Sequence, residues 1–268
     1  MQNISKQQMN KRNYKCIYIG GKQIGVDCLK QLLKYGIKPQ LVIANIDDKG
    51  KDTWYDSTLK FARKNNLETI SGKKVKDTIV IKAIKSIKSE IIFCIGGTQL
   101  IPQEVLEVPT LGCLNIHPAL LPKYRGRYST VHAMFNREKY TGVTIHWMDV
   151  GIDSGPIIVQ KKITIENSDT AKSLYDKFTK IGVELFTKFL QDFTKGKKII
   201  SRSQDNSKAT YYPQGLPNGG EIDWNWSGKQ IYSFIKSMTF EPFPPVSFKI
   251  GNKKMVIVDE KYFKGFNK

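Results

Sequence analysis

The sequence predicts an α/β fold, with a mostly parallel sheet covered by helices on both faces and a small β-rich module at the C-terminal end. Apolar runs of strand length alternate with segments of helical spacing from residue 14 to about residue 195. After a polar stretch at 201–209 the composition changes to proline, glycine and aromatic residues. With 268 residues, 40% of them hydrophobic, the chain can bury a large core, which excludes wholesale disorder.

The predicted elements follow one another in a regular order. A strand at 14–19, a glycine turn and a helix at 26–35 that ends at Gly36 form the first unit. Further strands are expected at 41–46, 91–95, 112–116, 142–148 and 156–165. Further helices are expected at 54–65, 79–87, 128–136 and from Asp169 to about Lys195, the last of them capped by Ser168.

The glycine turn after the first strand does not carry a nucleotide-binding fingerprint. A dinucleotide motif would require glycine where the chain has Lys22, and a P-loop would require Lys and Ser or Thr where it has Val26 and Asp27. We therefore interpret Gly20 and Gly21 as a tight turn, which supports neither NAD nor ATP chemistry.

Three parts of the chain are distinguished by composition. Residues 1–13 form a polar N-terminal extension, 14–202 the main domain and 203–268 the small C-terminal module. The start lacks the apolar region of a signal peptide, and no stretch is long enough to span a bilayer. The four cysteines form no CxxC pair and lie in or near apolar runs, as reduced core thiols do. We expect a cytoplasmic protein that does not bind membranes.

The strong positive charge raises the question of a nucleic-acid partner. The chain has 43 basic and 24 acidic residues, a net charge of +19, but only six of the basic residues are arginines. Arginine is the better side chain for planar recognition of phosphate, and the lysines are scattered along the chain. This pattern favours a solvated lysine-rich surface, so a nucleic-acid partner is not expected. If the protein is not an enzyme, the alternative function is that of an RNA-binding module.

The segment 114–127 combines residue types that are suited to catalysis. Strand alternation places Asn115 and His117 on one face, at the carboxyl end of a strand, where open α/β sheets bind ligands. Histidine can move a proton, and an amide can donate to a developing oxyanion. The basic residues Arg125 and Arg127 follow directly in a loop that contains glycine.

The second such segment, 142–156, ends in a loop with two carboxylates and two glycines. Asp153 is positioned to return towards His117, orient its imidazole and raise its basicity. Taken alone, Asp149 and Asp153 are more typical of turn residues. For His146, on the strand before this loop, a packing or hydrogen-bonding role is expected, and for His132 a structural one.

Together, NIHPALLPKYRG and GVTIHWMDVGIDSGPII resemble the formyltransferases that use 10-formyltetrahydrofolate, most closely the sugar N-formyltransferases. The resemblance covers roughly residues 14–195 and implies a Rossmann-like formyltransferase domain. It implies that Asn115, His117 and Asp153 are catalytic and that no metal is required. It also implies contacts with the folate cosubstrate from two loops, at Gly97, Leu100, Ile101, Asp149, Gly151 and Ile152.

The resemblance leaves several acceptors of the formyl group open. Glycinamide ribonucleotide is disfavoured, because the first loop lacks a Ser/Gly-rich phosphate cradle. Methionyl-tRNA is the main alternative, although the tRNA enzymes usually append a longer C-terminal domain than the 66 residues expected here. The run Arg125, Arg127 and Tyr128 resembles the sugar enzymes and implies contacts with a nucleotide-linked sugar, with buttressing of the loop as the alternative role for Arg125. We expect dTDP-4-amino-4,6-dideoxyglucose as acceptor, in the synthesis of surface polysaccharide such as O-antigen, and a homodimer that uses the aromatic tail.

Overall fold

The computed structural model describes residues 14–241 and 243–257, so the N-terminal extension and the last residues of the C-terminal module lie outside the described residues. A seven-stranded sheet forms the centre, in the order β3-β2-β1-β4-β5-β7-β8. The strands are β1 (Cys16–Gly20), β2 (Leu41–Ala44), β3 (Thr69–Ile70), β4 (Ile91–Ile95), β5 (Gly112–His117), β7 (Tyr140–Trp147) and β8 (Ile157–Thr164). The first five are parallel, and β7 and β8 are antiparallel to their neighbours.

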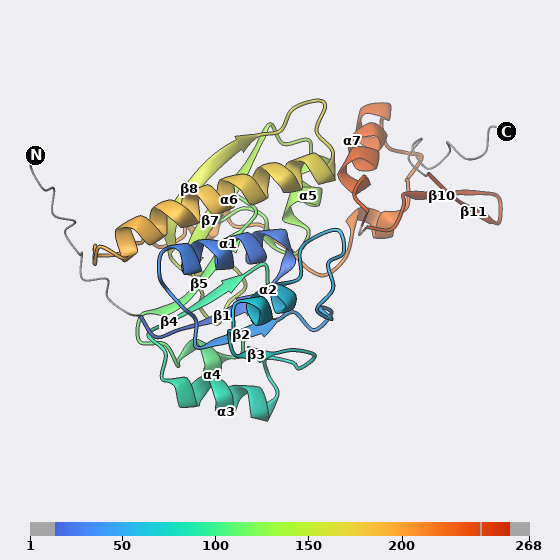
Figure 1. Ribbon diagram of the computed structural model, residues 1–268. Helices are drawn as coiled ribbons and strands as arrows, with labels where there is room; N and C mark the ends of the chain where they lie inside the picture. The colour runs from blue at the N-terminus through green and yellow to red at the C-terminus, as the bar shows by residue number, and fades with distance from the viewer. Residues whose placement is uncertain (1–13, 242, 258–268) are drawn as a thin grey trace, which may run out of the picture.

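Helices cover the sheet on both faces, as expected for strands that are apolar on both sides (Figure 1). They are α1 (Lys22–Lys34), α2 (Thr58–Lys64), α3 (Thr78–Ile87), α4 (Gln103–Leu106), α5 (Ser129–Phe135) and α6 (Ala171–Phe193). Buried side chains of α1 and α6 pack with Tyr18, Leu114 and Ile116 on one face. Side chains of α3 and α4 pack with Ile17, Ile19 and Cys113 on the other.

The predicted α/β class is confirmed, but three helix starts were wrong. Helix α1 begins at Lys22, not at residue 26. Helix α2 begins at Thr58, not at residue 54, because the hydroxyl of Ser57 caps it by accepting from the Lys60 N–H. Helix α6 is capped by Thr170 rather than by Ser168, through a reciprocal pair of hydrogen bonds with Ser173.

The C-terminal region contains the expected short strands and also a helix that was not predicted. The strands β10 (Ser247–Ile250) and β11 (Lys253–Val256) form an antiparallel pair. The helix α7 (Gly228–Met238) packs on α5, and both lie at one end of the molecule (Figure 1). The shared core contains Val131, Ile222, Phe234, Met238 and Val246.

The segment between α6 and this region stays attached to the main domain. Arg202 forms an antiparallel bridge with Ile157 of β8. The strand β9 (Tyr211–Tyr212) pairs in parallel with the short strand β6 (Arg125–Gly126), which follows the Asn-x-His strand. Residues far apart in sequence are thereby brought beside β5, and a domain boundary near residue 203 stays a prediction.

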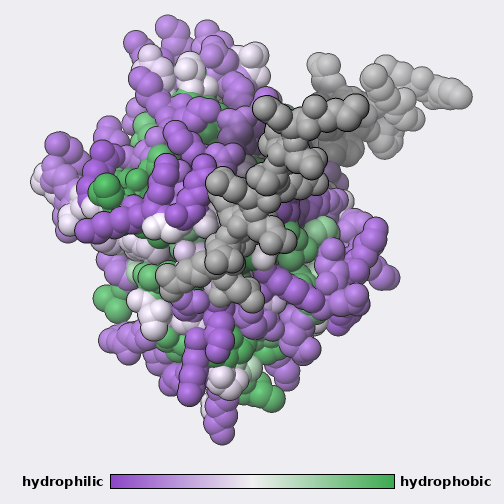
Figure 2. Space-filling model, turned by 60° about the vertical axis from the view of Figure 1, so that its left-hand side comes forward, coloured by the Kyte–Doolittle hydropathy of each residue, from purple (hydrophilic) through white to green (hydrophobic). Residues whose placement is uncertain are grey.

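Lysines and acidic residues are interspersed on the surface. On the face seen in Figure 2, hydrophilic residues predominate and hydrophobic ones occur in small groups. Exposed lysines form ion pairs with carboxylates, such as Lys85 with Glu104 and Lys161 with Glu184. All four cysteines are buried and free. In the described part of the chain, no helix combines the length and the apolarity needed to cross a membrane.

Candidate active site

The register of two antiparallel strands places the predicted catalytic residues of β5 on one face. Asn115 pairs with His146 of β7, and His117 pairs with Thr144. Their chain neighbours Leu114 and Ile116 point the other way, into the core under α1 and α6. The carboxyl end of β5 and the facing part of β7 therefore present an amide and two imidazoles together, at the edge of the sheet where ligands bind in α/β folds.

Asp153 reaches this cluster from the loop between β7 and β8. Its Oδ2 accepts a hydrogen bond from the Gly126 N–H at 2.8 Å and lies 3.4 Å from Nδ1 of His117. Its Oδ1 lies 3.4 Å from Nδ2 of Asn115. The backbone of Asp153 is left-handed, with a φ of 52°, a conformation that Asp tolerates better than most residues. The loop thus returns its carboxylate to the strand, and Asn115, His117 and Asp153 meet as predicted.

The contacts of the His117 imidazole define which of its two nitrogens carries the proton. Its Nε2 lies 2.8 Å from the carbonyl oxygen of Tyr124, which can only accept, so Nε2 carries the proton. Nδ1 therefore faces Asp153 with its lone pair in the neutral form. Burial lowers the pKa of His117 below its ordinary 6.5, although Asp153 and the Tyr124 carbonyl oppose that shift. A neutral imidazole with an available Nδ1 is suited to accept a proton.

Asp153 stays ionised in this environment. Burial alone would raise its pKa, but the neighbouring His117 and the Gly126 N–H oppose burial, and the pKa is held well below 3.8. Only 13% of the side chain is exposed, so the negative charge is poorly screened. The carboxylate can therefore stabilise a proton that arrives at Nδ1 of His117.

His146 belongs to the cluster, although its expected role was only packing or hydrogen bonding. It is 1% exposed, and its Nε2 lies 3.2 Å from Nδ2 of Asn115 and 3.6 Å from Oδ1 of Asp153. Strand alternation already predicted that its side chain lies on the face opposite Ile145 and Trp147. What the sequence did not reveal is the register that sets it opposite Asn115.

Gln204 is a second residue that sequence reasoning missed. Its Nε2 donates to the carbonyls of Asp153 at 2.8 Å and Gly155 at 2.7 Å. Its Oε1 accepts from Nε and Nη2 of Arg125 at 3.2 and 2.8 Å, and Arg125 also donates to Asn206. Arg125, predicted to bind substrate, thus braces the Asp153 loop through Gln204. No local pattern marks Gln204, because its partners lie 49 to 79 residues away.

Arg127 and Tyr128, the other two residues predicted to bind substrate, contact different parts of the protein. Arg127 is exposed, and its Nη2 donates to the carbonyl of Thr98 at 2.8 Å. This contact places a cation next to the loop that contains Gly97. Tyr128 precedes α5 and packs edge-on against Phe243, with 5.7 Å between ring centroids. The contacts of both residues with substrate stay predictions.

The first loop predicted to contact folate holds two glycines with different constraints. Gly96 has a φ of +67°, and a Cβ there would lie 2.1 Å from the carbonyl oxygen of Gly21. A Cβ at Gly97 would meet nothing within 4 Å. Leu100 is 72% exposed, and Ile101 packs partly on the core beneath α3. Gly96 is therefore required by the fold, whereas Gly97 leaves its space open to a ligand.

The second such loop is ordered by one of its carboxylates. Oδ1 of Asp149 accepts from the Gly151 N–H at 3.1 Å and from the Ser154 hydroxyl at 2.6 Å. Gly151 and Ile152 are exposed on this loop. Asp149 thus acts as a turn residue, and its side chain shapes the loop that carries Asp153.

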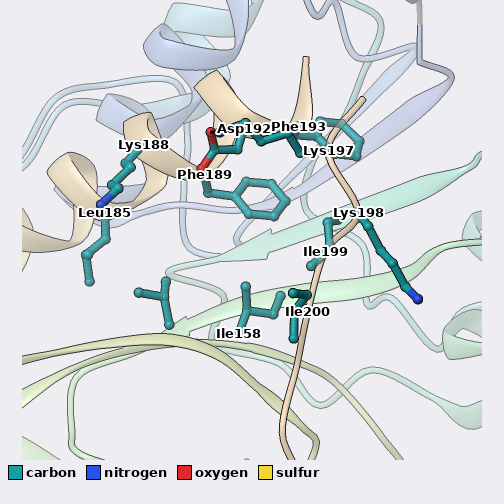
Figure 3. Close-up of a pocket in the computed structure, with 11 residues that line it drawn as sticks. Ile158, Leu185, Lys188, Phe189, Asp192, Phe193, Lys197, Lys198, Ile199 and Ile200 are labelled. Carbon is teal, nitrogen blue, oxygen red and sulfur yellow. Dashed lines mark ion pairs between the residues drawn. The ribbon is translucent and has the colours of Figure 1, made fainter. Parts of the chain in front are cut away.

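A separate hollow lies away from this cluster. It has a volume of about 180 Å³ and lies between the end of α6, β8 and residues 197–200 (Figure 3). Its lining is mainly apolar with a rim of lysines, one of which, Lys197, pairs with Asp192. None of the lining residues belongs to the catalytic cluster, so the chemistry lies elsewhere.

Comparison with known proteins identifies the family. Residues 17–190 match the formyl transferase family. The chain belongs to this family. A methionyl-tRNA formyltransferase of Thermodesulfovibrio yellowstonii is 33% identical over 252 residues, which are 93% of this chain and 80% of that protein.

Solved formyltransferase structures share the fold. WlaRD, a sugar 3N-formyl transferase solved in the presence of dTDP and 5-N-formyl-THF, has a TM-score of 0.74 at 29% identity, over 90% of this chain and 84% of that chain. A 4-N formyltransferase from Francisella tularensis has a TM-score of 0.72 at 25% identity, over 91% of this chain and 96% of that chain. The predicted Rossmann-like formyltransferase fold is thus confirmed.

Proposed function

We propose that this formyltransferase moves a formyl group from 10-formyltetrahydrofolate to the amine of a nucleotide-linked amino sugar, specifically dTDP-4-amino-4,6-dideoxyglucose. The observation that carries the proposal is the meeting of Asn115, His117 and Asp153 at the carboxyl end of β5. An amide donor, a neutral buried imidazole and a buried carboxylate are the groups that transfer of an acyl group to an amine requires.

Asn115 is proposed to stabilise the charge that develops on the formyl oxygen when the amine adds to the formyl carbon. An N–H of its amide donates to that oxygen. Such a donor contributes roughly 3 kcal/mol in the transition state. Asn115 is only partly buried, so its amide can be reached from the ligand side.

His117 and Asp153 are proposed to move the proton that the amine loses. Nδ1 of His117 takes this proton, directly or through one water, and returns it to the folate nitrogen that leaves as the bond between that nitrogen and the formyl carbon breaks. The resulting imidazolium faces Oδ2 of Asp153 at 3.4 Å, and its Nε2–H still donates to the Tyr124 carbonyl. Because Asp153 is an anion, it stabilises the imidazolium but not the neutral imidazole, so its effect is greatest while the proton is held.

The proposed folate contacts come from the loops on either side of this cluster. Gly97 leaves room for close backbone approach, Leu100 of the same loop exposes apolar surface, and Ile152 does so on the other loop. No metal enters any step.

A nucleotide sugar as acceptor is supported by two observations. The solved relatives include WlaRD, crystallised in the presence of dTDP, and a 4-N formyltransferase. In this chain, Arg127 projects an exposed guanidinium beside the Thr98 carbonyl, close in sequence to the catalytic strand. One such cation suits a single diphosphate better than a long RNA backbone.

The competing acceptor is methionyl-tRNA, which the 33% identical relative favours. The deciding experiment incubates purified protein and 10-formyltetrahydrofolate with a panel of 3-amino and 4-amino dTDP- and UDP-sugars and with methionyl-tRNA, and measures release of tetrahydrofolate. We expect turnover with the 4-amino dTDP-sugar. Formylation of tRNA alone would show that methionyl-tRNA is the acceptor and refute the proposal. RNA affinity without any folate-dependent turnover would favour an RNA-binding module.

The setting of the reaction is part of the proposal. Four buried free cysteines suit the reducing cytoplasm, where nucleotide sugars for surface polysaccharide such as O-antigen would be formylated. The homodimer through the aromatic C-terminal region stays a prediction, which sedimentation of the purified protein tests.

A further inference from the structure

A second histidine contacts the amide of Asn115 from the neighbouring strand. His146 is the cross-strand partner of Asn115, and Nε2 of His146 lies 3.2 Å from Nδ2 of Asn115. The imidazole is 1% exposed, so solvent does not compete for this contact. The pairing of β7 with β8 shifts register between Ile145 and His146, an irregularity that re-aims side chains at functional sites.

The other ring nitrogen of His146 determines which partner donates. Nδ1 lies 2.7 Å from the carbonyl oxygen of Trp147, which can only accept. Nδ1 therefore carries the proton and Nε2 presents a lone pair. The hydrogen bond must then run from the Asn115 N–H to His146.

The contact leaves one amide proton of Asn115 without a strong partner. The Asn115 amide has two N–H groups, and His146 takes one of them. The remaining contact of Nδ2 is with Oδ1 of Asp153 at 3.4 Å, which is long for a hydrogen bond. This second N–H is the one that remains available to a new acceptor.

We propose that His146 is a positioning residue for formyl transfer: it fixes the orientation of the Asn115 amide, so that an N–H and not the carbonyl oxygen faces the reacting formyl oxygen. The inference rests on the role proposed above for Asn115. An amide can rotate about its last side-chain bond, and the rotated form would turn an oxygen towards a developing negative charge. A lone-pair acceptor on the strand side excludes that form.

Two substitutions at His146 separate this role from simple packing. His146→Leu fills the site without an acceptor, whereas His146→Gln places an amide oxygen about where Nε2 lies. We expect kcat to fall about 10- to 100-fold in His146→Leu, less than the 10²- to 10³-fold typical when an oxyanion donor is deleted. KM for both substrates should change little, and His146→Gln should recover most of kcat. Thr141→Val, on the same strand and also buried, is the packing control.

A double-mutant cycle with Asn115 distinguishes failure of this inference from failure of the proposed function. In the Asn115→Ala background, His146→Leu should have no further effect, because no amide remains to be oriented. If Asn115→Ala itself keeps full turnover, the proposed mechanism is wrong. If Asn115→Ala is impaired but His146→Leu keeps full kcat, or lowers it equally in both backgrounds, only the role of His146 is refuted.

Nitrogen NMR gives a readout that does not depend on activity. The chain has three histidines, so labelled imidazole signals can be assigned by comparison with His146→Leu and His132→Gln. We expect His146 as the tautomer protonated on Nδ1 and His117 as the one protonated on Nε2. The opposite tautomer at His146 would overturn the inference, because Nε2 would then be a donor facing a donor.

Discussion

The charge of Asp153 can be removed with almost no change of shape by Asp153→Asn. If the new Oδ1 takes the place of Oδ2, it keeps the Gly126 N–H bond, and the new Nδ2 occupies the place of the present Oδ1. The loop geometry is then retained. What is lost is the attraction between the carboxylate and the imidazolium of His117 across 3.4 Å, about 5 kcal/mol at an effective dielectric constant of about 20.

This magnitude sets the expected loss of activity. Five kcal/mol is an upper bound, because residual solvent screens the pair, and we expect kcat to fall about 10²- to 10³-fold. The Tyr124 carbonyl already fixes the tautomer of His117, so the variant should not suffer the additional loss that a wrong tautomer causes in Ser-His-Asp triads. Turnover is measured as tetrahydrofolate release at saturating substrates.

The same substitution should move the titration of His117. The carboxylate favours the charged imidazole, so its removal should lower the pKa of His117 further below 6.5. NMR titration of the imidazole in the ligand-free protein measures this. Asp149→Asn changes a carboxylate of the same loop that bonds Gly151 and Ser154 instead, and it should leave the titration of His117 in place. A kcat loss below about tenfold, or an unchanged or raised pKa of His117, would refute the reasoning.

Four further outcomes are expected. Arg127→Ala should raise KM for the nucleotide sugar and leave kcat nearly unchanged, as initial-rate kinetics will show; a loss confined to kcat contradicts it. Gly96→Ala should destabilise the fold by about 2 kcal/mol or more in denaturant unfolding, because its φ is +67° and a Cβ would meet backbone, whereas Gly97→Ala should fold normally and weaken folate binding. Gln204→Leu, which frees the Asp153 loop, should lower kcat about 10- to 100-fold; wild-type turnover would show that the loop needs no brace. Because the unfolded chain protonates His117 more readily than the folded one, the free energy of unfolding should fall as pH drops below 6.5, and the slope should be smaller in His117→Asn.

The sequence by itself determined the layers of the fold and the core of the site. Strand alternation and the apolar runs suffice to place Asn115 and His117 on one face at a strand end, because side-chain direction in a strand is a local property. The helix α7 also had a local signal, the apolar residues Ile231, Phe234 and Met238 at helical spacing, which the aromatic and glycine-rich surroundings obscured. Helix starts were less certain, since caps such as Ser57 and Thr170 depend on which side chain reaches the free N–H groups.

The tertiary structure alone decided how these residues are held. The register of β5 against β7 makes His146 a partner of Asn115, and a carbonyl at Tyr124 selects the tautomer of His117. Gln204 enters the site because the chain returns along β6 after α6, although its partners are distant in sequence. Such contacts depend on strand order and chain reversal, which many distant residues set together, so no local pattern encodes them. The same holds for the basic residues after β5: the sequence left both substrate binding and buttressing of the loop open for Arg125, and the fold pairs Arg125 with Gln204 and leaves Arg127 exposed.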